Sequence, residues 1–393
     1  MSIPMTKHLL ESRREGFALA GTILAMLVVG AVVTGGFYAA SQEGQVARSS
    51  GSADDAMFLA ETGLSRVVAQ TTKGQLAALP VNTSINASPI TVNSGGTVLG
   101  SYVSGITRLS NELFLVRSTG TISRGRYGGA TRTLANVIRF RSMAFDHETA
   151  VMVYGGLTVG GNALVDGTDD YPAAWAAEGC TTVSSSAAVT TNPGTQIKTQ
   201  GSGDIVGATK RTSLAADSFT VFGDVTWNEL VGMREKVYPH NTTVGPDAVF
   251  TLTDCIVSAP DNWGSPLIPT NPCFDYAPII HAEGDLRISS SSTGQGILLV
   301  EGDLEISGGF NFYGIAVVLG EVTITGTGGH INGTSMVYGG GNISSTSTTL
   351  GDAALLYSSC AIERAILNNE SLSRGFPIAH RSWLDLSAIR GGN

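Results

Sequence analysis

Acidic side chains recur at a fixed spacing near the C-terminal end of the chain. Asp285, Asp303 and Glu321 each follow a glycine and precede a short alternating apolar pattern, and neighbouring copies lie 18 residues apart. If the copies stack as adjacent strands, the carboxylates form an outward column with a spacing of about 5 Å. Paired carboxylates at such distances can serve as general acid and general base in polysaccharide cleavage. The alternatives are a solvated acidic ladder and a ridge that binds carbohydrate or Ca²⁺.

A second acidic group, Asp166, Asp169 and Asp170, lies in one tight loop. Its oxygen atoms are suitable ligands for Ca²⁺, but the spacing does not match an EF-hand, which needs a more distant glutamate. The alternative is a solvated turn. The six histidines are scattered, without a His-x-x-x-His pair, and no P-loop is present. We therefore expect no resident metal, no cofactor and no enzymatic activity.

Four cysteines, Cys180, Cys255, Cys273 and Cys360, follow the apolar N-terminal segment. In an oxidising compartment they can form two disulfides, with three possible connectivities. We favour Cys255 with Cys273, because this pair would close a proline-rich loop, and that leaves Cys180 with Cys360. Free buried thiols are the alternative. Without a Cys-x-x-Cys pair, neither a zinc ribbon nor a thioredoxin-like site is supported.

An internal repeat must position the acidic column. Residues 284–288, 302–306 and 320–324 share one pattern, a looser copy begins at Gly341, and apolar runs precede the second and third copies. Repetition at a short fixed period signals a solenoid. Two short strands and two turns per copy predict a parallel β-helix, in which each coil buries its apolar side chains against the next.

The ends of such a stack need covering, because unpaired strand edges are exposed there. We expect residues 150–159 to form the opening coil. A helix at residues 361–367 could act as a cap. The tail from residue 371 onward would fold back over the last coil through Trp383 and Leu384.

The N-terminal part begins with a long apolar segment. Arg13 and Arg14 precede an uncharged run from Phe17 to Ala40, long enough to cross a membrane as a helix with the arginines on the cytoplasmic side. We expect one helix over residues 17–70, with soft points at its glycine and serine clusters. Small residues would let neighbouring helices approach closely, namely Gly21, Ala25, Gly30 and Gly35. Apolar positions after Gly51 predict a stripe that lies on a sheet.

Three strands are predicted after that helix, at residues 98–107, 112–122 and 131–141, with a connecting loop over residues 71–95. A long helix on a small antiparallel sheet follows from this order. The last two strands and their turn carry a run of arginines without acidic residues, namely Arg117, Arg124, Arg126, Arg132, Arg139 and Arg141. Such a region can contact phosphates or an acidic partner, and the alternative is a solvated strand face.

Several of these segments resemble type IV pilins. Residues 16–19, Gly-Phe-Ala-Leu before an apolar helix, look like a class III signal. Residues 56–64, which include Glu61, resemble a stretch found in PilX-type (GspK-like) minor pilins, and residues 114–121 and 131–140 resemble the strands that follow it. The resemblance implies cleavage between Gly16 and Phe17 by prepilin peptidase, N-methylation of Phe17, and packing of the helix in a filament core.

One residue departs from the common pilin pattern. Most major pilins carry glutamate at the fifth mature position, where this chain has Gly21. PilX-like proteins often lack that glutamate, which favours a priming or tip-proximal place over a bulk subunit. The leader is long, so that either Met1 or Met5 is the expected start.

The composition agrees with an exported, β-rich protein. The 393 residues include 50 glycines and only 14 % charged residues, and the net charge of −9 argues against a nucleic-acid partner. We expect an α+β pilin-like part followed by a β-helix domain. The expected divisions are a leader (1–16), an assembly helix (17–70), a β region (71–146), a β-helix (147–365) and a tail (366–393).

The sequence thus predicts a minor pilin of a type IV pilus or a related pseudopilus. It would pass once through the inner membrane with its C-terminal part in the periplasm, and would then be extracellular in the pilus. Expected partners are other pilins, the assembly machinery, prepilin peptidase and a surface carbohydrate or other ligand, with the β-helix displayed for adhesion. The competing hypotheses are a membrane-anchored polysaccharide-binding or polysaccharide-cleaving β-helix protein and an envelope protein that polymerises through its solenoid.

Overall fold

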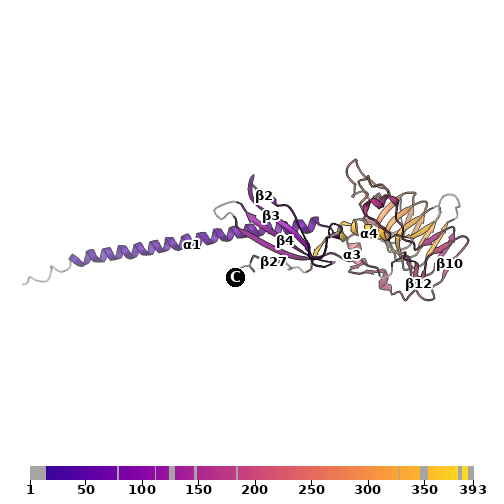
Figure 1. Cartoon of the computed structure of the whole chain (residues 1–393), viewed down its shortest axis with the longest axis horizontal. Coiled ribbons are helices and arrows are strands. Elements are labelled where there is room, and N and C mark those ends of the chain that lie inside the picture. Colours follow the sequence, from indigo (N-terminus) through magenta and orange to yellow (C-terminus); the bar gives the residue numbers. More distant parts are fainter. Residues whose placement is uncertain are drawn as a thin grey trace, which may run out of the picture.

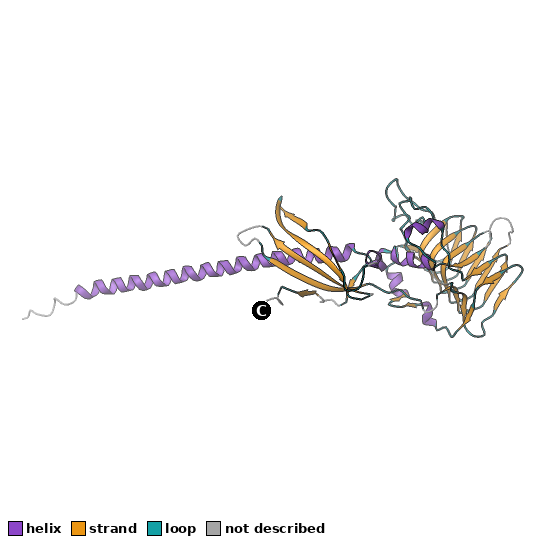
Figure 2. Cartoon of the chain, in the orientation of Figure 1, coloured by secondary structure: helices purple, strands orange, loops and turns teal. Residues whose placement is uncertain are grey.

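The computed structural model describes residues 15–77, 79–110, 112–123, 129–145, 148–182, 185–326, 328–345, 353–378 and 383–387. The molecule is elongated: a long helix leads into a small sheet, and a second, β-rich region lies beyond that sheet (Figure 1). Helices are few outside the N-terminal one, as the colouring by secondary structure shows (Figure 2). The leader up to residue 14, with Arg13 and Arg14, lies outside the described residues.

Helix α1 (Glu15–Gln70) runs without interruption through the glycine and serine clusters where soft points were expected. Its first two thirds are exposed, whereas Ala56, Leu59, Ala60 and Leu64 are buried against the sheet. These four residues recur at the spacing of one helical face, which is why this part of the helix can pack on a flat partner. The predicted apolar stripe is therefore confirmed.

The sheet that packs on α1, called here the helix-packed sheet, is antiparallel. Its strands are β1 (Ser84–Asn86), β2 (Ile90–Ser94), β3 (Thr97–Arg108), β4 (Leu113–Ile122), β5 (Thr131–Arg139), β26 (Phe376–Pro377) and β27 (Trp383–Asp385). Burial alternates along β4, as expected for a strand with one face on a core. The three predicted strands correspond to β3, β4 and β5. The loop expected over residues 71–95 instead contains α2 (Lys73–Ala77), β1 and β2, because short edge strands carry a weak sequence signal.

Glycines allow α1 to approach the helix-packed sheet closely. A Cβ atom added to Gly120 would lie 2.6 Å from the backbone nitrogen of Ala60, and one added to Gly63 would lie 2.7 Å from Ser104 Oγ. Ser104 donates a hydrogen bond of 3.1 Å to Ser118 beneath this contact. Small residues on both partners thus place the helix backbone directly on the strands.

The C-terminal segment returns to the helix-packed sheet. Phe376 pairs with Arg139, and Trp383 pairs with Asn136, so that β26 and β27 both lie along β5. The expectation that the tail covers the last coil is therefore wrong. The apolar residues Trp383 and Leu384 could pair at either site, and only the tertiary structure shows that the free strand edge is that of β5. The β-rich region (residues 148–373) is consequently an insertion between β5 and β26.

Two parallel sheets build the β-rich region. The seven-stranded parallel sheet holds, in spatial order, β10 (Ile197–Thr199), β7 (Leu157–Gly161), β24 (Gly341–Ser345), β22 (Val322–Thr325), β20 (Leu304–Ser307), β18 (Leu286–Ser289) and β16 (Thr242–Val244). The eleven-stranded parallel sheet holds β11 (Asp204–Val206), β8 (Leu164–Asp166), β25 (Ala354–Tyr357), β23 (His330–Val337), β21 (Asn311–Val318), β19 (Thr293–Val300), β17 (Ile279–Ala282) and β15 (Lys236–Tyr238), with β6 (Thr149–Val153), β9 (Ala187–Thr191) and β12 (Thr209–Arg211) beside this row. The chain alternates between the two sheets, and the 18-residue repeat is one such circuit.

Strands from the two ends of the β-rich region meet in the middle of the stack. The first half of β23 pairs with β25, and its second half pairs with β6 from the beginning of the region. Thr334 Oγ1 donates to the carbonyl of Thr149 at 2.8 Å, and the Tyr357 hydroxyl donates to Glu148 at 3.1 Å. Residues 150–159 were expected to open the stack, but they lie inside it, because β9–β12 pair on their far side.

The central strands of the eleven-stranded parallel sheet are buried on both faces. Along β19, Leu298 and Val300 point into the core between the sheets, whereas Ile297 and Leu299 contact a second cluster outside. This explains the continuous apolar runs of these strands. The outer cover consists of η2 (Ala216–Phe219), β13 (Val221–Phe222), β14 (Val225–Thr226), α3 (Trp227–Gly232), α4 (Ser359–Leu367) and α5 (Glu370–Ser373). Helix α4, expected at the end of the stack, packs across β19, β21 and β23 instead.

The close contact between α1 and the sheet gives a first prediction. Gly120→Ala should destabilise the helix-packed sheet by about 1–3 kcal/mol, because its Cβ meets helix backbone that cannot move aside locally. Hydrogen exchange of the β4 amides in the detergent-solubilised full chain should accelerate accordingly. Gly74→Ala, on α2 with nothing within 4 Å, is the matched control and should leave exchange unchanged. Equal behaviour of the two variants would contradict the close packing.

Candidate functional site

The most extensive candidate surface is the exposed apolar part of α1. Within the described residues, one helix is long and apolar enough to cross a membrane, by length and composition, and none of its apolar window is buried. Leu24, Met26, Val29 and Phe37 are among its exposed side chains. A surface of this extent costs free energy in water, and it is suited to contact lipid or other apolar helices.

The small residues predicted on this helix lie in the exposed stretch. A Cβ atom added to Gly21, Gly30 or Gly35 would meet nothing within 4 Å, and Ala25 is exposed as well. The hydroxyl of Thr34 donates to the carbonyl of Gly30 at 2.7 Å, so it needs no external partner in an apolar environment. Glu61 is exposed on the part of α1 that packs on the sheet.

The predicted processing site lies in the first turn of α1. Gly16 and Phe17 both have helical backbone, and Glu15 is the first described residue. The structure therefore leaves the junction between leader and helix as a prediction.

The acidic column has a structural role. Asp285 Oδ1 accepts a hydrogen bond from the backbone N–H of Asp303 at 2.9 Å, and Asp303 Oδ1 accepts one from the N–H of Glu321 at 2.8 Å. A Cβ atom on Gly302 would collide with Asp285 Oδ1, and the same holds for Gly320 and Asp303. The Gly-Asp pattern thus links each turn to the next, because glycine leaves the space that the carboxylate occupies.

A shallow cavity of about 370 Å³ lies beside the column. It is bordered by Thr242, Asp285 and Asp303, and by Arg287 and Glu305, which form an ion pair at 2.6 Å. This ion pair joins the neighbouring strands β18 and β20. The residues that line this cavity include no aromatic side chain, so the cavity lacks the aromatic platform on which sugar rings stack.

The acidic loop at residues 166–170 is used for local hydrogen bonds. Asp166 accepts from the N–H of Thr168, and Asp170 accepts from the N–H of Tyr171, both at 2.8 Å. Asp169 is buried and accepts from the backbone and hydroxyl of Ser359, at the start of α4. Among the described residues, no group of three or more His, Cys, Asp or Glu side chains could hold a metal ion.

The cysteines form two disulfides, Cys255–Cys273 and Cys180–Cys360, which are the pairs favoured from the sequence. The second pair joins the segment after η1 (Ala173–Glu178) to α4. It does not tie the ends of the stack together, since both partners lie on the flank of the eleven-stranded parallel sheet.

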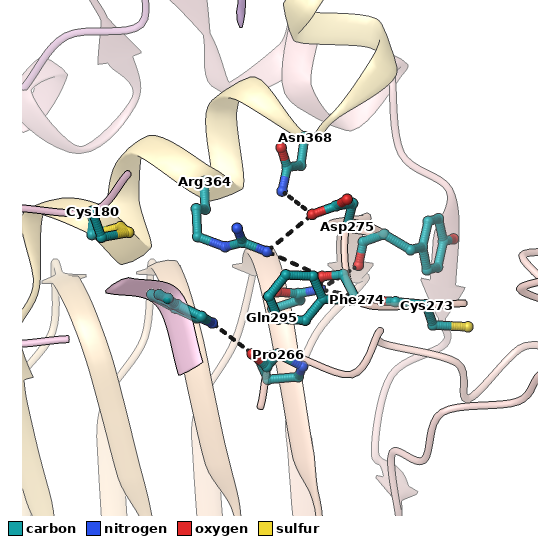
Figure 3. A network of polar contacts seen from close by, with 11 residues as sticks. Cys180, Pro266, Cys273, Phe274, Asp275, Gln295, Arg364 and Asn368 are labelled. Carbon is teal, nitrogen blue, oxygen red and sulfur yellow. Dashed lines mark hydrogen bonds and ion pairs between the residues drawn. A yellow bond between two sulfur atoms is a disulfide. The ribbon is translucent and has the colours of Figure 1, made fainter. Parts of the chain in front are cut away.

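Arg364 is the centre of a network beside this disulfide that the sequence did not reveal (Figure 3). Its guanidinium lies 4.9 Å from the ring centroid of Trp175 and 4.5 Å from that of Phe274. It also donates to the carbonyl of Phe274 at 3.2 Å and to Asp275 at 3.1 Å. Trp175 donates to the carbonyl of Pro266 at 2.6 Å. Three segments far apart in sequence are held here by one cation, which no local pattern could indicate.

The loop between β16 and β17, residues 245–277, is held from below by buried side chains. Lys236 donates to the carbonyls of Val257 and Ala259 at 2.6 and 2.5 Å, and Tyr238 donates to the carbonyl of Pro260 at 2.8 Å. Burial lowers the pKa of Lys236 and raises the pKa of Tyr238. Trp263 is fully buried and enters the core between the two parallel sheets.

The arginine-rich strands mainly serve the fold. Arg139 pairs with Glu112 at 3.2 Å and with Asp224, and the latter contact joins the helix-packed sheet to the β-rich region. Arg132 pairs with Asp385 on β27 at 3.7 Å, and Arg141 lies over the ring of Phe376. Arg117 is exposed, while Arg124 and Arg126 lie outside the described residues. The charges therefore connect strands and regions more than they form a phosphate-binding patch.

The hydrogen-bonded acidic column gives a second prediction. Asp303→Ala should destabilise the adjoining coils by about 1 kcal/mol, because the N–H of Glu321 loses its acceptor. Asp303→Asn retains a carbonyl oxygen at Oδ1 and should have the smaller effect. Hydrogen exchange at the Glu321 amide measures both. A column that serves only as a solvated surface would show no acceleration with either variant.

The Arg364 network gives a third prediction. Arg364→Lys should lower the free energy of unfolding by about 2 kcal/mol, because an ammonium cannot stack between two rings and donate in the same plane. The control is Arg374→Lys, at an exposed pair with Glu370, where a change of about 0.5 kcal/mol or less is expected. Denaturant unfolding followed by tryptophan fluorescence compares the two. Similar losses would show that Arg364 acts only as a surface charge.

Comparisons with known proteins give few matches. No family model matches the chain, and no curated protein matches it. Among solved structures, the chain is similar to the crystal structure of the competence-associated pilin ComZ from Thermus thermophilus. The match has 11 % sequence identity and a TM-score of 0.27, and it covers 85 % of this chain and 97 % of that chain.

Proposed function

We propose that the chain is a pilin-like structural subunit of a type IV pilus or a related pseudopilus. The observation that carries this proposal is the continuity of α1. One unbroken helix presents an exposed apolar stretch at its N-terminal end and packs on an antiparallel sheet at the other. Such a helix can reside in the inner membrane before assembly and pack against its neighbours in a filament afterwards, since both environments accept the same apolar surface.

The finer proposal is a PilX-type minor subunit that primes the filament or sits near its tip. Gly21 supports it, because this position carries no side chain that could form an ion pair with the amino terminus of a neighbouring subunit. The large insertion between β5 and β26 supports it as well. A β-rich region larger than the helix-packed sheet is more easily accommodated at a tip than in every subunit of a packed shaft (Figure 1).

We further propose that the β-rich region is a parallel β-helix that serves as a display and adhesion domain outside the membrane. The two all-parallel sheets, the 18-residue circuit and the turn-to-turn hydrogen bonds of the acidic column support this assignment. We propose no enzymatic activity. In support, two of the three column carboxylates already accept backbone hydrogen bonds, and Glu305 is paired with Arg287.

Processing of the N-terminus tests the proposed function. The chain extracted from membranes of cells that contain prepilin peptidase should begin at N-methylated Phe17, and the chain from cells without the peptidase should remain uncut. Gly16→Glu should abolish the cleavage, because it replaces the small residue next to the scissile bond. Intact-mass measurement and N-terminal sequencing distinguish these products.

The control for this experiment is Gly21→Ala, which changes the mature helix but leaves the junction intact. This variant should be processed normally. An uncut chain in the presence of the peptidase, or a chain that begins after Ala40, would refute the pilin proposal. The result would then favour the hypothesis of an anchored or secreted β-rich protein.

A further inference from the structure

The loop between β16 and β17 exposes apolar side chains in a confined place. Phe250 and Cys255 form an antiparallel bridge, so that residues 249–257 make a small hairpin. Leu252 at its tip is 100 % exposed, and Phe250 is 49 % exposed. Val249, Val257 and Ile268 of the same loop are exposed as well. Outside α1, no other loop in the described part of the chain exposes as many large apolar side chains.

This hairpin is fixed rather than loosely folded. The Cys255–Cys273 disulfide joins its second strand to the far end of the loop. Asn262 is fully buried and donates to the carbonyls of Val249 and Ile256, both at 3.0 Å. At the tip, the N–H of Thr251 donates to the carbonyl of Asp254 at 2.8 Å, and the N–H of Asp254 donates to Thr251 Oγ1 at 3.0 Å.

The exposed apolar side chains of this rigid hairpin have no role in folding. The loop is already anchored by Lys236, Tyr238 and Trp263, and Leu252, which is fully exposed, contributes no burial to the folded state. A rigid apolar tip, however, binds a partner with little loss of conformational entropy. An aromatic or aliphatic side chain that fills a pocket on a partner can anchor a protein interface.

The charges of the loop indicate the kind of partner. Residues 245–277 contain Asp247, Asp254, Asp261 and Asp275 and no lysine or arginine, and Asp275 is paired with Arg364 at 3.1 Å. Asp254 lies two residues from Leu252 at the tip. This pattern disfavours an anionic lipid surface, since like charges repel, and it complements a surface on which cations surround an apolar pocket.

We propose that the hairpin of residues 249–257 is a docking element that inserts Phe250 and Leu252 into an apolar pocket, bordered by basic side chains, on another protein. The inference rests on the proposed function in one respect, namely that the β-rich region is displayed outside the membrane, where such a partner can reach it.

Photo-crosslinking in the intact host cells tests the proposal. Leu252 is replaced by p-benzoylphenylalanine in the full chain, which its complete exposure allows without disturbing the core. Val206, an exposed residue at the opposite end of the stack, receives the same substitution as a control. Mass spectrometry then identifies the linked peptide of any adduct.

The expected result is one adduct that forms from position 252 and not from position 206, and whose linked peptide contains apolar residues beside lysine or arginine. Asp247→Asn with Asp254→Asn, which keeps the side-chain shapes, should lower the adduct yield. The Asp247→Lys and Asp254→Lys pair should lower it further, by about tenfold or more, because attraction becomes repulsion. Asp217→Lys, at an exposed site on η2, should leave the yield unchanged.

Several outcomes would overturn the proposal: no adduct, equal adducts from both positions, or an adduct yield that is the same in the charge variants as in the original chain. An adduct with lipid or with a second copy of this chain would overturn it as well. Failure here is separable from failure of the proposed function. A chain that starts at methylated Phe17 and forms no adduct refutes the docking element alone. A chain that remains uncut and still forms the charge-dependent adduct refutes the pilin proposal alone.

Discussion

Two C-terminal strands, β26 and β27, pair with β5, and the rest of the architecture depends on this pairing. The chain leaves the helix-packed sheet at the end of β5 and comes back to the same strand as β26 and β27. An insertion between two paired strands must bring its own ends together. The β-rich region does so by placing β25 and β6 end to end along β23, so that one circuit of the stack is shared by the two ends of the insertion. Loss of pairing at either place would release both ends, which makes the sheet and the insertion one mechanical unit.

The junction between the two regions has the character of a fixed joint. Arg139 contacts Asp224, Asp224 also donates its backbone N–H to the carbonyl of Ser142 at 2.9 Å, and Phe145 lies against Phe222. Charged, backbone and aromatic contacts therefore act at the same few residues. Such a joint couples the orientation of the helix-packed sheet to that of the β-rich region, because bending between them would break all of these contacts at once.

Glycine has two different roles in the two regions. On Gly63 and Gly120 the missing side chain lets a helix lie against strands, whereas on Gly302 and Gly320 it makes room for the carboxylate of the preceding turn. The acidic column, which suggested acid–base chemistry, is thereby explained by packing and hydrogen bonding. Among the described residues, the exposed large apolar side chains are most concentrated on α1 and on the disulfide-closed loop.

The sequence by itself determined the features that arise from local periodicity: the long apolar helix and its buried stripe, strands β3 to β5, and the 18-residue repeat. It also favoured the observed cysteine pairs, since a proline-rich loop between Cys255 and Cys273 is short. Only the tertiary structure decided where segments far apart in sequence meet. The return of residues 376–385 to β5, the place of β6 inside the stack, the position of α4 on its flank and the stacking of Arg364 between Trp175 and Phe274 are all of this kind. Their residues fit several sites equally well by polarity and size, and the choice among these sites depends on which strand edge or apolar face the rest of the chain leaves free.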